Sequence, residues 1–163
     1  MTFRLLRIIS VGCALWAPFG AMAQQVAFGG LETDTSAPVE ITSDSLNVNQ
    51  TTGQAVFSGN VLVIQSDMRL QAGTLQVEYG NEEQSEINRL LASGGVTLVA
   101  QSNAAESSDA VYDLRSGTLV MTGDVLLTQG QNAISGTRLT VDMETGKGQM
   151  DGRVRTILTP GGR

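Results

Sequence analysis

Residues 53–63 of this chain read GQAVFSGNVLV, a turn glycine followed by a strand-like run that a second glycine interrupts. The Gly-x-Val step inside this stretch, Gly59-Asn60-Val61, recurs at Gly94, Gly123 and Gly152, each time with valine two residues later. Recurrence of one step along a chain is typical of repeat architectures. The stretch therefore predicts that the chain consists of about four similar units.

The spacing around these glycines sets the length of the unit. An opening residue lies 15 positions before three of them, at Asp44, Ser108 and Thr137. The next opener follows after 14 positions in the intervals 59–73, 94–108 and 123–137. The period is therefore 29 residues. The unit that opens at Gly73 is six residues longer, and the extra residues fall in the Gly/Asn/Glu-rich stretch 80–86, which predicts a longer loop.

Apolar residues alternate with polar ones at the same phase in every unit. Leu46 and Val48 flank Asn47 after the first opener, and Leu139 and Val141 flank Thr140 at the matching positions after the last. Alternation with a period of two and one apolar face predicts half-buried antiparallel strands. We therefore expect an all-β fold of about eight strand segments that bend at a shared level, as a curved jelly-roll or an open barrel.

Two sets of glycines have different expected roles. Gly53, Gly117 and Gly146 each lie six residues before a Gly-x-Val step, at the end of polar tripeptides that are typical of turns with a positive φ. The glycine of the step itself lies inside a continuous strand pattern, which predicts a bend or bulge. The sheet is therefore expected to curve at the same height in each unit.

The N-terminus has the composition of a targeting segment. Arg4 and Arg7 precede an apolar run that ends at an Ala-x-Ala signal, so we expect a signal peptide over residues 1–23 with cleavage after Ala23. Residues 24–38 lack periodicity and are expected to form a flexible lead-in, followed by one β-domain at 39–159 and a tail at 160–163. The only cysteine, Cys13, lies within this expected signal peptide.

Composition excludes several classes of function. The chain has no histidine, so it cannot form a histidine zinc site or a histidine-based catalytic triad. Its formal net charge is −6, which disfavours nucleic acid as a partner. Paired carboxylates, Asp109 with Asp113 or Glu82 with Glu83, are the remaining candidates for catalysis, but their positions favour a solvated face. We expect no enzyme activity, no metal and no cofactor.

The interior and the edges each leave two interpretations open. The few aromatic residues after the signal segment indicate an aliphatic interior, which is either a packed core, the interpretation that the sequence favours, or an elongated groove for a hydrocarbon chain. The edge segments 42–49 and 153–158 carry opposite charges, Asp44 against Arg153 and Arg155. These charges either support head-to-tail addition of copies or are simply solvated.

The repeat at residues 43–63, with its second copy at 112–127, resembles the OstA-like family of periplasmic lipopolysaccharide-transport proteins. The resemblance covers about residues 38–158. It implies an antiparallel β-jelly-roll that is open at both ends and shields acyl chains, with a free periplasmic location. It also implies stacking on an LptC-like inner-membrane partner, an LptD-like outer-membrane partner and further copies, through strand edges at the two ends. A ligand-free, self-assembling scaffold is the alternative.

By position in the repeat, the resemblance assigns fourteen side chains to the acyl-chain groove. They share the apolar phase of the alternation. The candidates are Leu46, Val48, Val61, Val63, Leu75, Val77, Val96, Leu98, Tyr112, Met121, Val125, Leu127, Leu139 and Val141.

Overall fold

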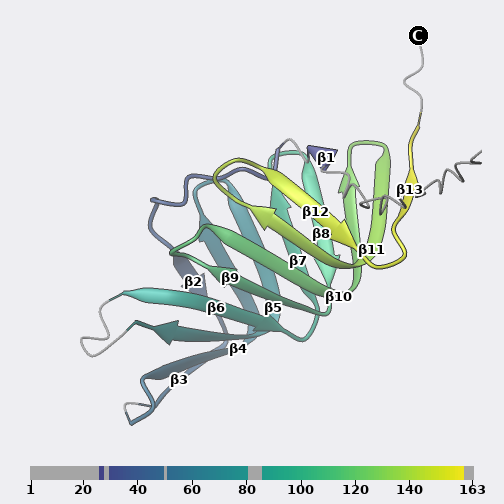
Figure 1. Cartoon of the computed structure of the whole chain (residues 1–163). Helices are drawn as coiled ribbons and strands as arrows, with labels where there is room; N and C mark the ends of the chain where they lie inside the picture. The colour runs from purple at the N-terminus through teal and green to yellow at the C-terminus, as the bar shows by residue number, and fades with distance from the viewer. Residues whose placement is uncertain (1–25, 28–29, 50, 81–85, 160–163) are drawn as a thin grey trace, which may run out of the picture.

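The computed structural model describes residues 26–27, 30–49, 51–80 and 86–159, and of residues 26 and 27 only the backbone. Within these ranges all regular secondary structure is β-strand, joined into one antiparallel network (Figure 1). The strands are β1 (Val26–Ala27), β2 (Glu40–Thr42), β3 (Ser45–Asn49), β4 (Gln54–Gln65), β5 (Met68–Tyr79), β6 (Ile87–Ser93), β7 (Val96–Ala100), β8 (Asn103–Ser107), β9 (Asp109–Asp113), β10 (Thr118–Gln129), β11 (Asn132–Asp142), β12 (Lys147–Asp151) and β13 (Arg155–Ile157). In this described part of the chain, no helix is long and apolar enough to cross a membrane.

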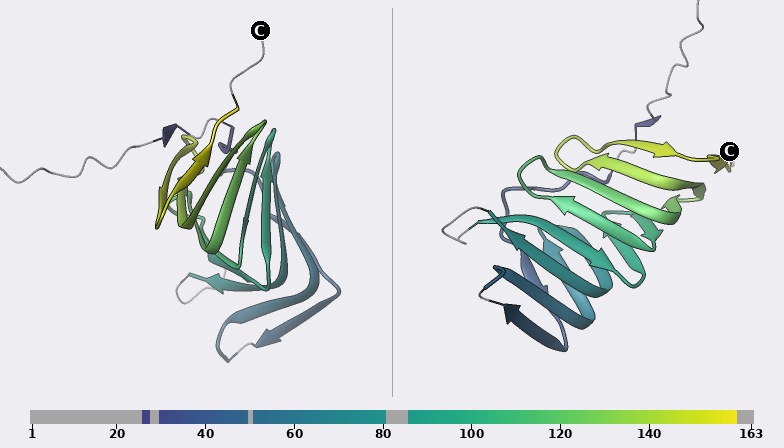
Figure 2. Two further views of the ribbon diagram at one scale, coloured as in Figure 1. Left: turned by 90° about the vertical axis from the view of Figure 1, so that its right-hand side faces the viewer. Right: turned by 60° about the horizontal axis from the view of Figure 1, so that its bottom comes forward.

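The strands build two walls that share their longest members. Wall A runs β3, β4, β5, β6, β9, β10, β11, β12 and β1, and wall B runs β2, β4, β5, β7, β8, β10, β11 and β13. Each of β4, β5, β10 and β11 belongs to wall A over one half and to wall B over the other. The chain thus forms a meander of eight bent strands, as Figure 2 shows from two sides, and the expected all-β jelly-roll is confirmed.

The bends coincide with the Gly-x-Val steps, along a line that we call the crease. The β4–β5 register shifts between Ser58 and Val61, and the β10–β11 register shifts between Thr122 and Val125. Gly59 and Gly123 there have φ angles of 78° and 83°, and Asn60, which follows Gly59, has 46°. Consecutive left-handed residues turn the strand without ending it, and glycine adopts this region without strain.

The opener of each unit lies against the glycine of its own step. A Cβ built on Gly123 would lie 2.6 Å from the Ser108 Oγ, and one built on Gly59 would lie 2.5 Å from the Asp44 Oδ2. The Ser108 amide also donates to the Gly123 carbonyl at 3.0 Å. The spacing of 15 residues therefore reflects a direct contact across the crease.

The predicted turn glycines are confirmed, and each turn has a second fixed element. Gly53, Gly117 and Gly146 have φ angles of 62°, 63° and 66°. Four residues before Gly117, the Asp113 carboxylate accepts from the backbone amides of Arg115 and Ser116 at 3.1 and 3.0 Å. Asn49 and Asp142 close the other two turns in the same way.

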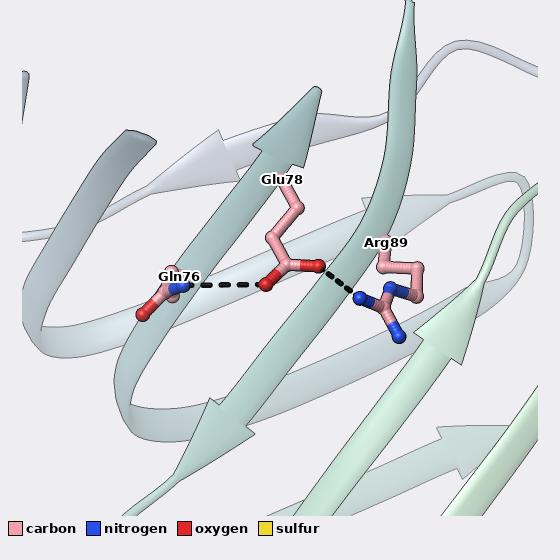
Figure 3. Close-up of polar contacts among 3 residues, drawn as sticks. All are labelled: Gln76, Glu78 and Arg89. Carbon is pink, nitrogen blue, oxygen red and sulfur yellow. Dashed lines mark hydrogen bonds and ion pairs between the residues drawn. The ribbon is translucent and has the colours of Figure 1, made fainter. Parts of the chain in front are cut away.

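Polar side chains on the outer face of wall A hold the strand register (Figure 3). The Arg89 guanidinium on β6 lies 2.6 Å from the Glu78 carboxylate on β5, and these two residues are register partners. Gln76, two residues before Glu78 on β5, donates to the same carboxylate at 3.5 Å. A slip of one residue would turn these charges toward the interior, so the pair favours the observed register.

The segment expected as a flexible lead-in is partly ordered against the walls, which corrects that expectation for residues 30–38. Leu31 is fully buried within the same hydrophobic cluster as the strands. Its burial depends on contacts with residues far along the chain, which local periodicity does not reveal. The expected signal peptide, residues 1–23, and the tail, 160–163, lie outside the described residues, as do Glu82 and Glu83.

Candidate functional site

The inner faces of the two walls each carry a continuous apolar row that runs across successive strands of the stack. Register pairing links one row in wall A through Leu46, Phe57, Leu75, Ala92, Ala110, Met121, Leu139 and Met150. A matching row in wall B links Ile41, Val63, Leu70, Leu98, Ala105, Leu127 and Ile134. At about 4.8 Å between strands, the wall A row, on eight strands, is about 34 Å long, and the wall B row, on seven strands, is about 29 Å long.

The structure brings most of the fourteen candidate residues together in this interior. Twelve of them are at most 2% exposed, and they come from both walls. These twelve are Val61, Val63, Leu75, Val77, Val96, Leu98, Tyr112, Met121, Val125, Leu127, Leu139 and Val141. The alternation therefore identified the inner face correctly; whether these side chains contact acyl chains stays a prediction.

The two remaining candidates lie on the inner face but are open to solvent. Leu46 and Val48 are 54% and 59% exposed, although their register partners are Phe57 and the buried Ala55. Among the described strands, β3 pairs with β4 alone, so it is the last strand of wall A. The apolar surface therefore continues to this end of the stack and remains uncovered there.

The other end of the stack also exposes apolar side chains beside a strand edge. Val154, Ile157 and Leu158, in and around β13, are 50%, 51% and 69% exposed. The described partner of β13 is β11, so its outer edge has free backbone groups. Arg153 and Arg155 are exposed at this end, opposite in charge to Asp44 at the other. Unpaired strand edges are templates for adding another strand.

The middle of the stack is closed rather than hollowed into an open channel. Leu75, Leu98, Met121 and Leu127 are fully buried, because side chains of the opposite wall cover them. In this form the middle has the packed aliphatic interior that the sequence favours, whereas both ends are open. An acyl chain would therefore need the walls to separate at the side opposite the crease.

We call the side opposite the crease the mouth; it lies between the turns of the two walls. A polar pair crosses it, because the Tyr112 hydroxyl on wall A donates to the Gln65 side-chain oxygen on wall B at 2.9 Å. Both residues are buried, at 1% exposure each. Burial, followed by the nearby Glu144 carboxylate, raises the pKa of Tyr112 to about 12.

Residues 30–38, which we call the strap, run along the mouth from β1 to β2 (Figure 1). The Thr33 amide donates to the Met143 carbonyl on the rim of wall A at 2.8 Å, and the Thr33 hydroxyl lies 3.1 Å from the Gln65 carbonyl on the rim of wall B. The Thr35 hydroxyl contacts Glu144 at 3.3 Å. The strap therefore bridges the two rims.

Sequence reasoning missed the strap and the polar pair. Leu31 sits in a segment without alternation, so no local signal marks it as buried. Gln65 is a polar residue at the end of an apolar strand, where exposure is the ordinary expectation, yet it is 1% exposed. Leu119 lies two residues before Met121 and carried the same alternation signal, which could have identified it.

Two of the carboxylates considered for catalysis, Asp109 and Asp113, lie on one strand, and the contacts of Asp113 are those of a turn. Asp109 and Asp113 lie on β9, and the residues between them that face inward are Ala110 and Tyr112. Hydrogen bonds from backbone amides, that of Ser116 foremost, lower the pKa of the Asp113 carboxyl. Among the described residues no group of three or more Cys, Asp or Glu side chains could hold a metal ion.

Residues 40–147, the stretch that forms most of both walls, match the family described as LptA/(LptD N-terminal domain) LPS transport protein. This match covers more than half of the chain. The chain belongs to this family. The LptA-type resemblance inferred from the repeat is thereby confirmed.

Individual relatives include two proteins named LptA. An uncharacterised protein of Rhizobium meliloti (strain 1021) is 33% identical over 97% of this chain and 91% of its own length. The lipopolysaccharide export system protein LptA of Escherichia coli (strain K12) is 27% identical over 78% of this chain and 74% of its own. LptA of Haemophilus influenzae is 26% identical, with 85% and 86% coverage.

A solved structure shows the same fold as the LptA-type chain described here. LptH, the LptA homologous periplasmic component of the lipopolysaccharide transport device of Pseudomonas aeruginosa, superposes with a TM-score of 0.69 at 16% identity. The match covers 78% of this chain and 99% of LptH. The two-walled, crease-bent β architecture is therefore common to both proteins.

Proposed function

We propose that this protein is a periplasmic lipopolysaccharide carrier that shields acyl chains between its two walls. Membership in a lipopolysaccharide-transport family supports the general role. The observation that carries the specific proposal is the pair of apolar rows, one across eight strands in wall A and one across seven in wall B, together with the exposed Leu46 and Val48 where the wall A surface ends. The acyl chains lie along these rows, on the inner-face residues that the alternation identifies.

Simple energetics give this role a physical reason. Burial of one CH₂ group is worth about 0.8 kcal/mol, so an acyl chain of about twelve carbons exposes roughly 10 kcal/mol of unfavourable free energy to water. A continuous apolar interior removes that cost along the whole path. The chain is acidic, with 16 Asp and Glu against 10 Lys and Arg, which favours phosphorylated headgroups remaining in solvent.

The two open ends support a bridging role. One end offers the edge of β3 and β2 with Asp44, and the other offers the edge of β13 with Arg153 and Arg155. Head-to-tail pairing of these edges would join the apolar rows of successive copies, or of LptC-like and LptD-like neighbours, into one longer path. Lipopolysaccharide would then pass from the inner-membrane to the outer-membrane components without entering water.

The exposed end of the row allows a binding test that leaves the fold intact. Leu46→Asp and Val48→Asp place a charge on the inner face of β3, where the side chains are already solvent-exposed. Asn47→Asp is the matched control, because Asn47 lies between them and faces the other side of the strand. Residues 24–163 would be incubated with lipopolysaccharide or with phospholipid, and co-elution measured by gel filtration.

We expect co-elution of the wild type and Asn47→Asp with lipopolysaccharide, and a clear loss for Leu46→Asp and Val48→Asp. Equal binding by all variants would contradict the inner-face site. Binding of neither amphiphile, together with growth of large assemblies, would instead favour the ligand-free scaffold, for which the packed middle of the stack is the supporting observation.

The edge proposal has its own test. Deletion of residues 153–163 removes β13 and both arginines of that end, so the concentration-dependent mass measured by light scattering is expected to fall to that of a single copy. A control deletion of residues 160–163 keeps β13 and both arginines, and should leave the mass unchanged. Retention of the larger mass after the longer deletion would refute assembly through this edge.

A further inference from the structure

The strap makes its most specific contact with the polar pair at the mouth. The Gln65 side-chain amide donates to two strap carbonyls, that of Thr35 at 2.9 Å and that of Ala37 at 3.0 Å. Its side-chain oxygen accepts from the Tyr112 hydroxyl at 2.9 Å. A buried side-chain amide needs these partners, since a donor left without an acceptor in the interior destabilises the protein. Any movement of the strap therefore requires a new acceptor for Gln65.

The strap also excludes other occupants from this part of the interior. Leu31 is fully buried in the cluster formed by the inner faces, and Glu32 lies over Gly146 on the rim of wall A. The Thr33 contacts to Met143 and Gln65 hold the two rims together. With these contacts in place, the mouth cannot admit a chain from the side.

We propose that the strap occupies the part of the lipid site that binds the carbonyl group of an acyl chain, and that lipopolysaccharide binds by displacing the strap from Gln65. The ligand class is an ester- or amide-linked acyl chain: its hydrocarbon replaces Leu31 among the inner-face side chains, and its carbonyl accepts from the Gln65 amide in place of the Thr35 and Ala37 carbonyls. This inference rests on the proposed lipopolysaccharide-binding function and adds a defined polar subsite and an internal competitor to it.

Amide hydrogen exchange tests the displacement directly. In the lipid-free protein the Thr33 amide is protected by its bond to Met143. On addition of lipopolysaccharide, exchange across residues 30–38 is expected to accelerate, while the inner strands β5 and β10 become no less protected. If the wild type binds lipopolysaccharide and the strap keeps or gains protection, displacement is refuted while the carrier function stands. If the wild type does not bind, the carrier function fails and this inference fails with it.

A reversible lock provides the second test. A Cβ built on Gly146 lies 3.5 Å from the Glu32 Cβ, within the range of a disulfide, and the chain after residue 23 contains no other cysteine. The double variant Glu32→Cys/Gly146→Cys should lose at least about tenfold in lipopolysaccharide affinity when oxidised and recover it when reduced. The single variants are the controls. Equal affinity in both redox states, with the disulfide verified by mass, would overturn the proposal.

Two substitutions separate a lipid contact at Gln65 from a role in holding the strap alone. Thr33→Val weakens the strap without changing the Gln65 side chain, so lipopolysaccharide affinity is expected to rise several-fold. Gln65→Leu weakens the strap as well, but it also removes the proposed donor, so its affinity should fall below that of Thr33→Val. Equal increases for the two variants would show that Gln65 holds the strap and does not contact the lipid.

Discussion

The contact between opener and glycine at the crease can be tested with a pair of matched substitutions. Gly123 and Gly95 both have a φ of 83° and both lie at the crease. A Cβ on Gly123 would approach the Ser108 Oγ and Cβ to 2.6 and 2.7 Å, whereas a Cβ on Gly95 would meet nothing within 4 Å. Gly95→Ala therefore measures the cost of a positive φ alone, and Gly123→Ala measures that cost plus the contact.

The expected magnitudes follow from these two contributions. A left-handed backbone costs a non-glycine residue about 1–2 kcal/mol, so Gly95→Ala should lower the free energy of unfolding by that amount. Overpacking adds about 1–3 kcal/mol, so Gly123→Ala should cost roughly 2–5 kcal/mol. At about 3 °C per kcal/mol for a domain of this size, the melting temperatures of the two variants should differ by about 3–9 °C.

Thermal unfolding followed by circular dichroism measures the difference, and a third substitution checks its cause. Ser108→Gly removes both atoms that the new Cβ would meet, so the double variant Ser108→Gly/Gly123→Ala should recover most of the excess loss. Equal melting temperatures for Gly95→Ala and Gly123→Ala would refute the contact as the reason for glycine in this step. Failure of the Ser108 change to restore stability would do the same.

Three further predictions address the interior and the turns. Because burial raises the pKa of Tyr112 to about 12, the stabilisation from its neutral hydroxyl is complete below about pH 10 and is lost as the pH rises from about 10 through 12. Urea unfolding should show that the free energy of unfolding falls by roughly 1–3 kcal/mol over this pH range. The variant Tyr112→Phe should abolish this fall. Leu98→Ala should lower the free energy of unfolding by about 2–5 kcal/mol because Leu98 is fully buried. Val99→Ala, at the neighbouring 38% exposed residue, should lower it by only about 0.5 kcal/mol. Similar values for the two variants would contradict the assigned inner face. Asp113→Ala should lower the free energy of unfolding by about 1 kcal/mol, because it removes the two turn hydrogen bonds, and Asp109→Ala is a near-neutral control. The destabilisation by Asp113→Ala should become smaller as acid protonates the Asp113 carboxyl, whose pKa lies below its ordinary value.

Much of the fold could be predicted because its signals are local and repeated. Alternation with a period of two assigns a side chain to one face of a strand regardless of what covers it, so it places Leu75 and Leu98 on the inner face without any tertiary contact. The left-handed glycines at Gly59 and Gly117 were equally predictable, since turns and bends require a φ that other residues adopt with strain.

The candidate site was only partly predictable, because burial depends on neighbours distant in sequence. Leu46 and Leu75 have the same phase, yet one is 54% exposed and the other fully buried, since only the second has strands on both sides and a wall opposite. The strap is a stronger case, because its Thr33 contacts Gln65 and Met143, which lie 32 and 110 positions further along the chain.

By itself, the sequence determined the repeat, the alternating faces, the turns and the family, since each rests on residue types at short, regular spacings. Only the tertiary structure decided that the two walls close over each other, that both ends stay open, and that the strap covers the mouth through Gln65. The physical reason is that local patterns specify backbone conformation and side-chain direction, whereas the covering of a side chain is set by whichever distant segment the folded chain brings against it.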